Sequence, residues 1–297
     1  MRVTPGMTAD NALFNLQKGR TLLNRIQEQI ASGLTVNRPS DDPITTRQVL
    51  DLENKLDKGE QYLSNITKSN LWLNMTETAL QGISDIVTQV KKVAGTITSG
   101  SSDVTVRETA ASQIKELKKQ LIDIANTQMG DQFIFAGFKN DAPPFTTADN
   151  TYRGTADQIS VEIDQNSTSA MNLTGDALLK GTGGYGSIDI LTAMDDLVTA
   201  INANNPTDIS NAAAQLDASS NQITNARSDV ASRIIRLDSA KTMITRNQNT
   251  ISGIISDTLG VDYMKAATEL NQQQTAFEAA LSATAKISQL SLLDYIR

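Results

Sequence analysis

The chain has 297 residues, with 26 Lys and Arg against 33 Asp and Glu, which gives a formal net charge of −7. It contains no His and no Cys. This excludes zinc and iron–sulfur sites built on those residues, His-ligated haem, and Ser-His-Asp or Cys-His catalysis. Acidic residues outnumber basic ones, whereas proteins that bind nucleic acid typically carry an excess of basic residues on the binding surface. We therefore expect no metal, no cofactor and no nucleic-acid partner.

The sequence predicts no membrane partner. No apolar run approaches the roughly 18–20 residues that a membrane span requires. The first residues, Met1-Arg2-Val3-Thr4, are not followed by the apolar stretch of a cleaved secretory signal. We expect that if the protein leaves the cell, it does so by another route.

The positions of the prolines predict where the long helices lie. Because proline interrupts helices, the proline-free windows 44–142 and 207–297 should contain them. Apolar periodicity then predicts helices over about 7–33, 44–98, 104–129, 188–201, 209–251 and 262–292. Asp41-Asp42-Pro43 is a helix-start signal, and Gly100-Ser101-Ser102-Asp103 indicates a turn with a helix cap.

The strongest periodicity is a seven-residue repeat near the C-terminal end. Apolar residues recur at strict steps of seven: Ile209, Leu216, Ile223, Val230, Leu237, Ile244 and Ile251. A repeat held over this length indicates a left-handed coiled coil with a partner helix. The matching stripe in 44–98 flanks the only Trp, Trp72, which we assign to helix packing. The stripes of the first and last helices are diluted by Ala, Gly and Gln, so these helices need a partner.

The middle of the chain has a different composition. The segments Phe133-Ile134-Phe135, Tyr152 and Ile159–Ile163 alternate like short strands. We predict a mainly α fold with a small β-rich insertion, built as a discontinuous coiled-coil rod of long helices with the N- and C-terminal helices adjacent. The predicted domains are a terminal helical assembly domain (1–36 plus 262–297), a helical rod (37–140 plus 188–261) and the insertion (141–187).

Two sequence patterns resemble those of binding or catalytic sites, but the residues around each favour a structural role. Gly181-Thr182-Gly183-Gly184-Tyr185-Gly186 matches a dinucleotide-binding pattern, but no strand is predicted before it, so a flexible loop is the better interpretation. Asp41-Asp42 and Asp195-Asp196 are adjacent carboxylates, and side chains adjacent in sequence point apart. We expect no catalytic residue and no enzyme activity.

Two stretches resemble the bacterial flagellin superfamily. The first is Ile30-Ala31-Ser32-Gly33-Leu34-Thr35-Val36-Asn37-Arg38-Pro39-Ser40-Asp41-Asp42-Pro43, and the second is Leu290-Ser291-Leu292-Leu293-Asp294-Tyr295-Ile296. The resemblance covers about 1–140 and 205–297. Within the superfamily, Gly130–Phe145 and the ending Asp294-Tyr295-Ile296 are most similar to the hook-associated protein 3 family. The start, Met1-Arg2-Val3-Thr4, differs from that of filament flagellins.

The resemblance implies a flagellin-like fold and a structural subunit at the junction between the flagellar hook and filament. It implies export through the flagellar type III channel to an extracellular location. The implied partners are other copies of the chain in a ring, a neighbouring hook-associated protein, flagellin, and a cytosolic export chaperone at the C-terminal helix. The termini are expected to be poorly ordered in the monomer and to pair on assembly.

We expect the terminal helices to form the assembly interface by burying their diluted apolar stripes. The expected residues are Leu16, Leu23, Ile26, Ile30, Leu270, Phe277, Leu281 and Ile287. Two alternatives remain. One is a flagellin filament subunit, and the other is a cytosolic coiled-coil scaffold, which would have ordered, dimeric termini in the purified chain.

Overall fold

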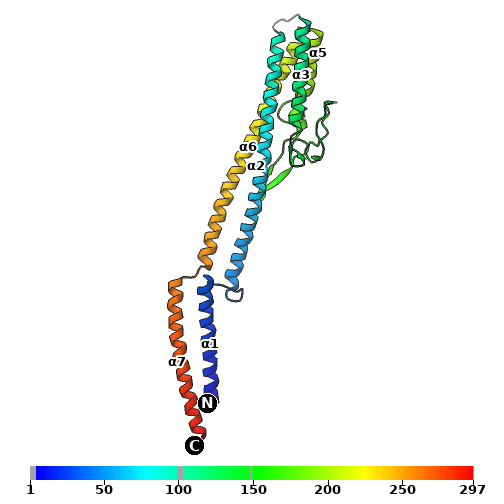
Figure 1. Cartoon of the computed structure of the whole chain (residues 1–297). Helices are drawn as coiled ribbons and strands as arrows, with labels where there is room; N and C mark the ends of the chain where they lie inside the picture. Colours follow the sequence, from blue (N-terminus) through cyan, green and yellow to red (C-terminus); the bar gives the residue numbers. More distant parts are fainter. Residues whose placement is uncertain (1–4, 99–102, 148, 297) are drawn as a thin grey trace. The chain divides into compact units, whose positions relative to one another are not determined.

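The computed structural model describes residues 5–98, 103–147 and 149–296, although the side chains of 5, 6, 8, 9, 98 and 287–296 lie outside this description (Figure 1). The described chain is mostly helical, with two small antiparallel sheets. The helices are α1 (Pro5–Ser32), α2 (Pro43–Thr98), α3 (Val104–Ala125), α4 (Gly175–Leu179), α5 (Ile190–Ala203), α6 (Pro206–Leu259) and α7 (Tyr263–Ile296). The strands are β1 (Gln128–Met129), β2 (Gln132–Phe133), β3 (Ser160–Asp164) and β4 (Ser167–Ala170).

The chain divides into two compact units. The central unit is Lys58–Arg246, and the terminal unit combines Met1–Asp57 with Asn247–Arg297. Both ends of the chain therefore contribute to one unit, and α2 and α6 contribute residues to both. The finer division into three domains stays a prediction.

The seven-residue repeats form the core of the central unit. On α2 the buried residues include Ile66, Leu73, Leu80 and Val87, and on α6 they include Leu216, Ile223, Val230 and Leu237. Polar pairs join the two helices beside this core. Arg227 donates from Nε and Nη2 to Oε1 of Glu77 at 2.9 and 2.6 Å, and Asn70 Nδ2 donates to Asp238 Oδ1 at 3.0 Å. Trp72 is buried in the same core, as predicted.

Helices α3 and α5 pack on each other within the central unit (Figure 1). Lys118 on α3 donates to both carboxylate oxygens of Asp195 on α5, each at 2.6 Å. Asn150 Nδ2 also donates to Asp195 Oδ2, at 2.7 Å, which ties the 149–153 loop to the two helices. Helix α5 begins two residues later than predicted, because Asp189 caps it by accepting a hydrogen bond from the Thr192 N–H.

The end of α3 was predicted too far along the chain. The helix ends at Ala125, not at residue 129, because the Asn126 side chain bonds outside the helix. Its Oδ1 accepts from the Phe145 N–H at 3.1 Å, and its Nδ2 donates to the Phe145 carbonyl at 2.9 Å. At the other end, Asp103 caps α3 by accepting from the Thr105 N–H at 2.8 Å. The rest of the predicted turn, residues 100–102, lies outside the described residues.

The segment 133–163 contains less strand than predicted. Phe133 ends β2, but Ile134 and Phe135 are buried in the turn that follows it. Tyr152 is not in a strand. Its hydroxyl lies 2.8 Å from the Phe135 carbonyl and 3.0 Å from that of Thr155, and its ring packs on Phe145. Side-chain contacts and single backbone hydrogen bonds, such as that from the Gly175 N–H to the Phe135 carbonyl at 2.8 Å, hold this segment in place. The predicted strand at 159–163 is confirmed as β3, which pairs with the polar strand β4.

The glycine run 181–186 forms the loop between α4 and α5. A short helix precedes it instead of the strand that a dinucleotide site requires. Gln222 of α6 fixes the loop: its Nε2 donates to the carbonyls of Leu178 and Ile188, and its Oε1 accepts from the Ile188 N–H at 3.0 Å. A Cβ at Gly186 would lie 2.3 Å from Gln222 Oε1, so this glycine allows the close approach. Within the described residues, no helix is both long and apolar enough to cross a membrane.

Candidate assembly interface

The terminal unit is built around the pairing of α1 with α7, the first and last helices of the chain (Figure 1). We call these two helices the terminal pair. Small and apolar residues on α1 recur at steps of three and four, through Leu16, Gly19, Leu23, Ile26 and Ile30. A Cβ at Gly19 would lie 3.3 Å from Cδ2 of Phe277, so this stripe of α1 faces α7. The predicted adjacency of the terminal helices is confirmed.

The expected interface residues differ in burial. Ile26 is buried; Leu16, Leu23, Ile30, Leu270 and Phe277 are half-buried; Leu281 is exposed; and the side chain of Ile287 lies outside the described residues. The pairing of α1 with α7 therefore covers much of the described stripe within one chain. It leaves part of the apolar area of both helices open to further contacts.

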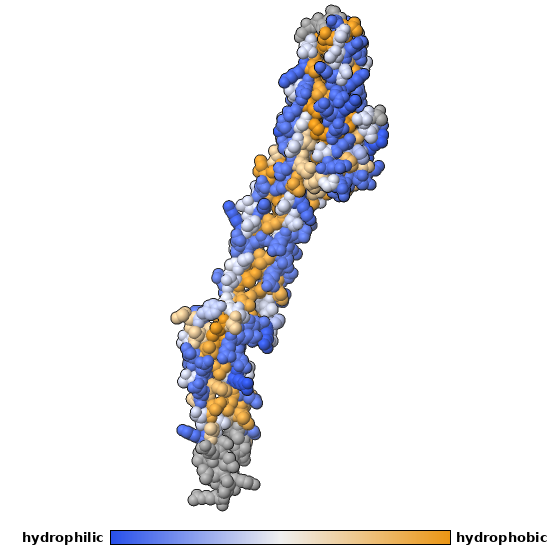
Figure 2. Space-filling view, in the orientation of Figure 1, coloured by the Kyte–Doolittle hydropathy of each residue, from blue (hydrophilic) through white to orange (hydrophobic). Residues whose placement is uncertain are grey.

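A second set of apolar side chains on α1 was not predicted from the sequence. Met7, Leu13, Phe14 and Leu22 are exposed, and on a helical wheel they fall outside the stripe that holds Gly19. On the face shown in Figure 2, apolar residues gather along the line where the two helices meet. The spacing of seven between Met7 and Phe14 is a signal that could have identified the second set. The exposed residues give the terminal pair an apolar surface that remains free in the single chain.

The two connecting segments of the terminal unit are hydrogen-bonded to each other. The Thr35 N–H donates to the Leu259 carbonyl at 2.7 Å, and the Val261 N–H donates to the Gly33 carbonyl at 3.0 Å. Gly33 has a φ of +74°, and a Cβ there would lie 2.8 Å from the Tyr263 hydroxyl oxygen. Both features require glycine at this position. These bonds fix the start of α7 beside the end of α1.

Residues 37–43, which belong to the first stretch that resembles flagellins, form a turn that caps α2, as their sequence predicts. Asp42 Oδ1 accepts from the N–H groups of Ile44 and Thr45 at the start of α2, and Oδ2 accepts from the Thr45 hydroxyl at 2.7 Å. The hydrogen bonds from Thr45, first from its hydroxyl and then from its N–H, lower the pKa of Asp42. Asp41 accepts from the Arg38 N–H at 3.0 Å. Both carboxylates therefore serve local backbone structure.

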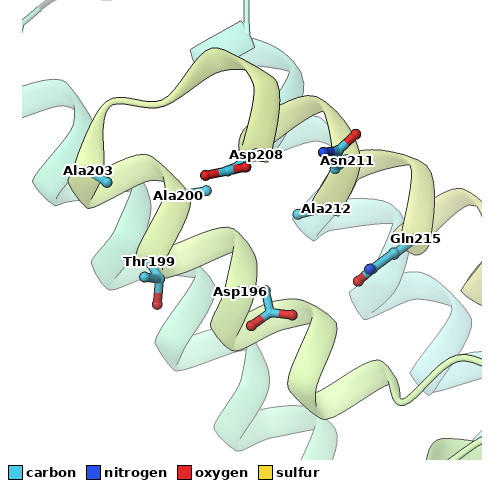
Figure 3. A pocket seen from close by; sticks show the side chains of 8 residues that line it. All are labelled: Asp196, Thr199, Ala200, Ala203, Asp208, Asn211, Ala212 and Gln215. Carbon is cyan, nitrogen blue, oxygen red and sulfur yellow. The ribbon is translucent and has the colours of Figure 1, made fainter.

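The two carboxylates of the second acidic pair, Asp195 and Asp196, have different surroundings. Asp195 binds Lys118, whereas Asp196 lines a pocket of about 290 Å³ between α5 and α6 (Figure 3). Asp208 lines the same pocket and accepts a hydrogen bond from Asn205 Nδ2 at 2.5 Å. The remaining lining residues are neutral: Thr199, Ala200, Ala203, Asn211, Ala212 and Gln215. Across the described ranges, no three Asp or Glu side chains are grouped closely enough to hold a metal ion.

Two tyrosines of the central unit, Tyr152 and Tyr185, hold the insertion. The Tyr185 hydroxyl donates to Asp229 Oδ2 at 2.6 Å, and Arg233 pairs with the same carboxylate while donating to the Asn172 carbonyl at 2.9 Å. Burial, reinforced by the hydrogen bond to Asp229, raises the pKa of Tyr185. Burial and the charge of Asp176 raise the pKa of Tyr152. Both phenols are therefore held neutral in structural positions.

Paired terminal helices with exposed apolar side chains place the chain in the class of helical structural subunits that associate with other chains. Two family models match it. The bacterial flagellin N-terminal helical region matches residues 4–140, and the C-terminal helical region matches residues 213–296. The chain belongs to the bacterial flagellin family.

Individual relatives agree with this assignment. The chain is 25% identical to flagellar hook-associated protein 3 of Escherichia coli K12, over 98% of both chains. It is 23% identical to a flagellin of Clostridium tyrobutyricum over 68% of this chain and 54% of that one. Its fold is similar to that of flagellar hook-associated protein 3 from Legionella pneumophila, with a TM-score of 0.62, 14% identity, and coverage of 69% of this chain and 97% of that one.

Proposed function

We propose that this chain is the structural subunit that joins the hook of the bacterial flagellum to its filament. The observation that carries the proposal is the similarity to a hook-associated protein 3 over nearly the whole of both chains. The flagellin, in contrast, aligns with only part of each chain. The pairing of α1 with α7 supports it, because such a pair presents a surface through which subunits can associate.

In this proposal several copies form a ring between a preceding hook-associated protein and the first flagellins. The stripe through Leu23 and Phe277 holds the terminal pair together, and its uncovered part contacts neighbouring subunits. Each contact is weak because the stripe is diluted by small and polar residues. A ring of many copies makes the joint strong, because each further contact becomes intramolecular.

We further propose that the subunit reaches this extracellular position through the flagellar type III channel. A cytosolic chaperone would cover α7 until export. The exposed side chains of Met264 and Leu281 support this part, because an apolar helix surface needs cover in the cytosol. We propose no catalysis: the adjacent acidic residues cap helices, form an ion pair or line an otherwise neutral pocket.

Electron microscopy of cells that lack the chain tests the function, with the culture medium assayed for shed flagellin. A junction protein predicts bare hooks with flagellin free in the medium. Bare hooks with no flagellin anywhere would identify a filament subunit instead. Normal filaments and motility would overturn the flagellar proposal in favour of a cytosolic coiled-coil scaffold. Restoring the chain on a plasmid is the control, because it should return attached filaments.

A further inference from the structure

The segment Gly130–Phe145 contains one aromatic residue with no role inside the chain. Phe133, Ile134, Phe135 and Phe145 are buried in the central unit, whereas the side chain of Phe138 is 61% exposed. The other large apolar residues exposed in the described central unit are aliphatic, and Ile235 on α6 is an example at 67%. An exposed aromatic side chain is a common anchor of protein interfaces.

The backbone around Phe138 is firmly held. Gly137 has a φ of +68°, and a Cβ there would lie 2.2 Å from the Thr155 carbonyl oxygen. The Phe138 N–H donates to Thr155 Oγ1 at 2.8 Å, and the Thr155 N–H donates to the Ala136 carbonyl at 3.0 Å. The side chain is therefore presented from an ordered turn. Such an arrangement reduces the entropy lost on binding.

The central unit also carries a groove that suits an aromatic ring. It lies between α2 and α3, has a volume of about 410 Å³, and includes the half-buried side chains of Val93 and Leu117. The other lining residues are polar: Gln89, Lys92, Gln113, Glu116 and Gln120. Val93 and Leu117 therefore form a small apolar strip in the groove, bordered by three glutamines and two opposite charges.

We propose that Phe138 of one copy inserts between Val93 and Leu117 of the next copy. This inference rests on the proposed function, because a ring of identical subunits requires two different surfaces on every chain, which contact each other head to tail. Charge supports a second copy as the partner. Exposed Lys139 and Asp141 lie beside Phe138, and exposed Lys92 and Glu116 line the groove. Asp141 therefore has Lys92 as a counterpart, and Glu116, which pairs with Lys119 on its own helix at 3.3 Å, can share its charge with Lys139.

Cysteine pairs test the contact directly, because the chain has no Cys of its own. Lys139→Cys and Gln113→Cys are introduced into one full-length chain, which is expressed in the source bacterium and treated with a short bismaleimide on intact flagella. A head-to-tail contact predicts a ladder of covalent dimers, trimers and larger species. Each single variant should stay monomeric. A link within one chain, or no link in cells with attached filaments, would overturn the proposal.

A matched pair controls for random collision. Lys139→Cys combined with Ser239→Cys places the second thiol on an exposed position of α6 in the same unit. This pair should give no ladder, and a ladder equal to that of the Gln113 pair would contradict the proposed contact.

A third variant tests the aromatic ring. Phe138→Ala in the Lys139→Cys and Gln113→Cys background should weaken the contact by about thirtyfold and remove most of the ladder. Ile235→Ala, at a comparably exposed position, should leave the ladder unchanged. Unchanged cross-linking after Phe138→Ala would overturn the role of the ring. Bare hooks in the deletion strain together with an absent ladder would refute only this contact, whereas normal filaments in that strain would refute the proposed function.

Discussion

The two units of the chain use similar helical repeats but differ in how deeply they bury them. In the central unit, α2, α3, α5 and α6 all contribute side chains with no exposed surface. In the terminal unit, the buried apolar residues among the described side chains are Ile26, Val49 and Ala266. Two neighbouring helices cover only one face of each other, whereas additional helices and the insertion enclose a core. The comparison teaches that a repeat specifies a partner but does not specify how much of the helix becomes buried.

The largest expected effect tests the depth of the central core. Phe135→Ala removes a fully buried ring and should lower the free energy of unfolding of the central unit by about 3–5 kcal/mol. The fluorescence of Trp72, the only Trp and a buried residue of this unit, reports the transition during urea unfolding. Phe138→Ala is the control and should change the stability by less than about 0.5 kcal/mol. Equal losses in the two variants would contradict the assigned core.

The next effect tests the polar clamp on the glycine loop. Gln222→Ala leaves the Leu178 and Ile188 carbonyls and the Ile188 N–H without their partner, so the free energy of unfolding should fall by about 2–3 kcal/mol. The same urea experiment measures it. Asn221→Ala changes an exposed neighbour and should have little effect. If the two variants are equally stable, the loop does not depend on Gln222.

A smaller effect follows from two tyrosines of the central unit. The folded-state pKa values of Tyr152 and Tyr185 lie above the ordinary value of 10.0, so above that pH the folded state retains protons that the unfolded state releases. This contribution to stability is present below about pH 10 and is lost as the pH rises, by about 1 kcal/mol for each tyrosine by about pH 11. Urea unfolding at a series of pH values, followed by Trp72, measures it.

The controls separate these tyrosines from general alkaline unfolding. Tyr152→Phe and Tyr185→Phe together should flatten the decline of stability with pH, because neither position can then release a proton. Tyr263→Phe, in the terminal unit, should leave the decline unchanged. A decline of the same slope in the double variant would show that other groups cause it.

The smallest expected effect on the central unit comes from the terminal pair. Leu23→Asp or Phe277→Asp places a charge on the stripe between α1 and α7 and should change central-unit stability by less than about 0.5 kcal/mol. The same variants should abolish attached filaments, because the terminal pair no longer forms. Asn24→Asp adds the same charge at an exposed adjacent position and should keep the filaments. Loss of the central unit's helical circular dichroism signal in Leu23→Asp would contradict the separation of core from assembly surface.

The long helices could be predicted from the sequence because their signals are repeated many times. The steps of seven from Ile209 to Ile251 and the absence of proline after Pro206 fix α6 almost completely. The segment 128–187, which contains the four described strands, lacks such redundancy. Its strands have two to five residues, β4 is Ser-Thr-Ser-Ala, and Tyr152 is placed by its side chain, so apolar alternation could not assign them.

The candidate interface was predictable only in part. The spacing of Leu16, Leu23 and Phe277 located the stripe, because a coiled-coil stripe is a local pattern. The exposure of a side chain, in contrast, depends on the whole fold and not on the neighbouring sequence. Phe14 and Phe138 are exposed because no other segment of the described chain covers them. Only the folded arrangement distinguishes an aromatic residue that is free to contact another chain.

The contact between Gly19 and Phe277 has a consequence for the order of events during synthesis. The two residues are separated by almost the whole length of the chain. A chain that emerges with its N-terminus first completes α1 early, yet the partner of α1 is among the last segments to appear. Helix α1 therefore cannot pair within its own chain until nearly all residues have been made. Under the proposed function the delay is longer still, because the chaperone covers α7 until export, and α1 pairs with α7 only after that.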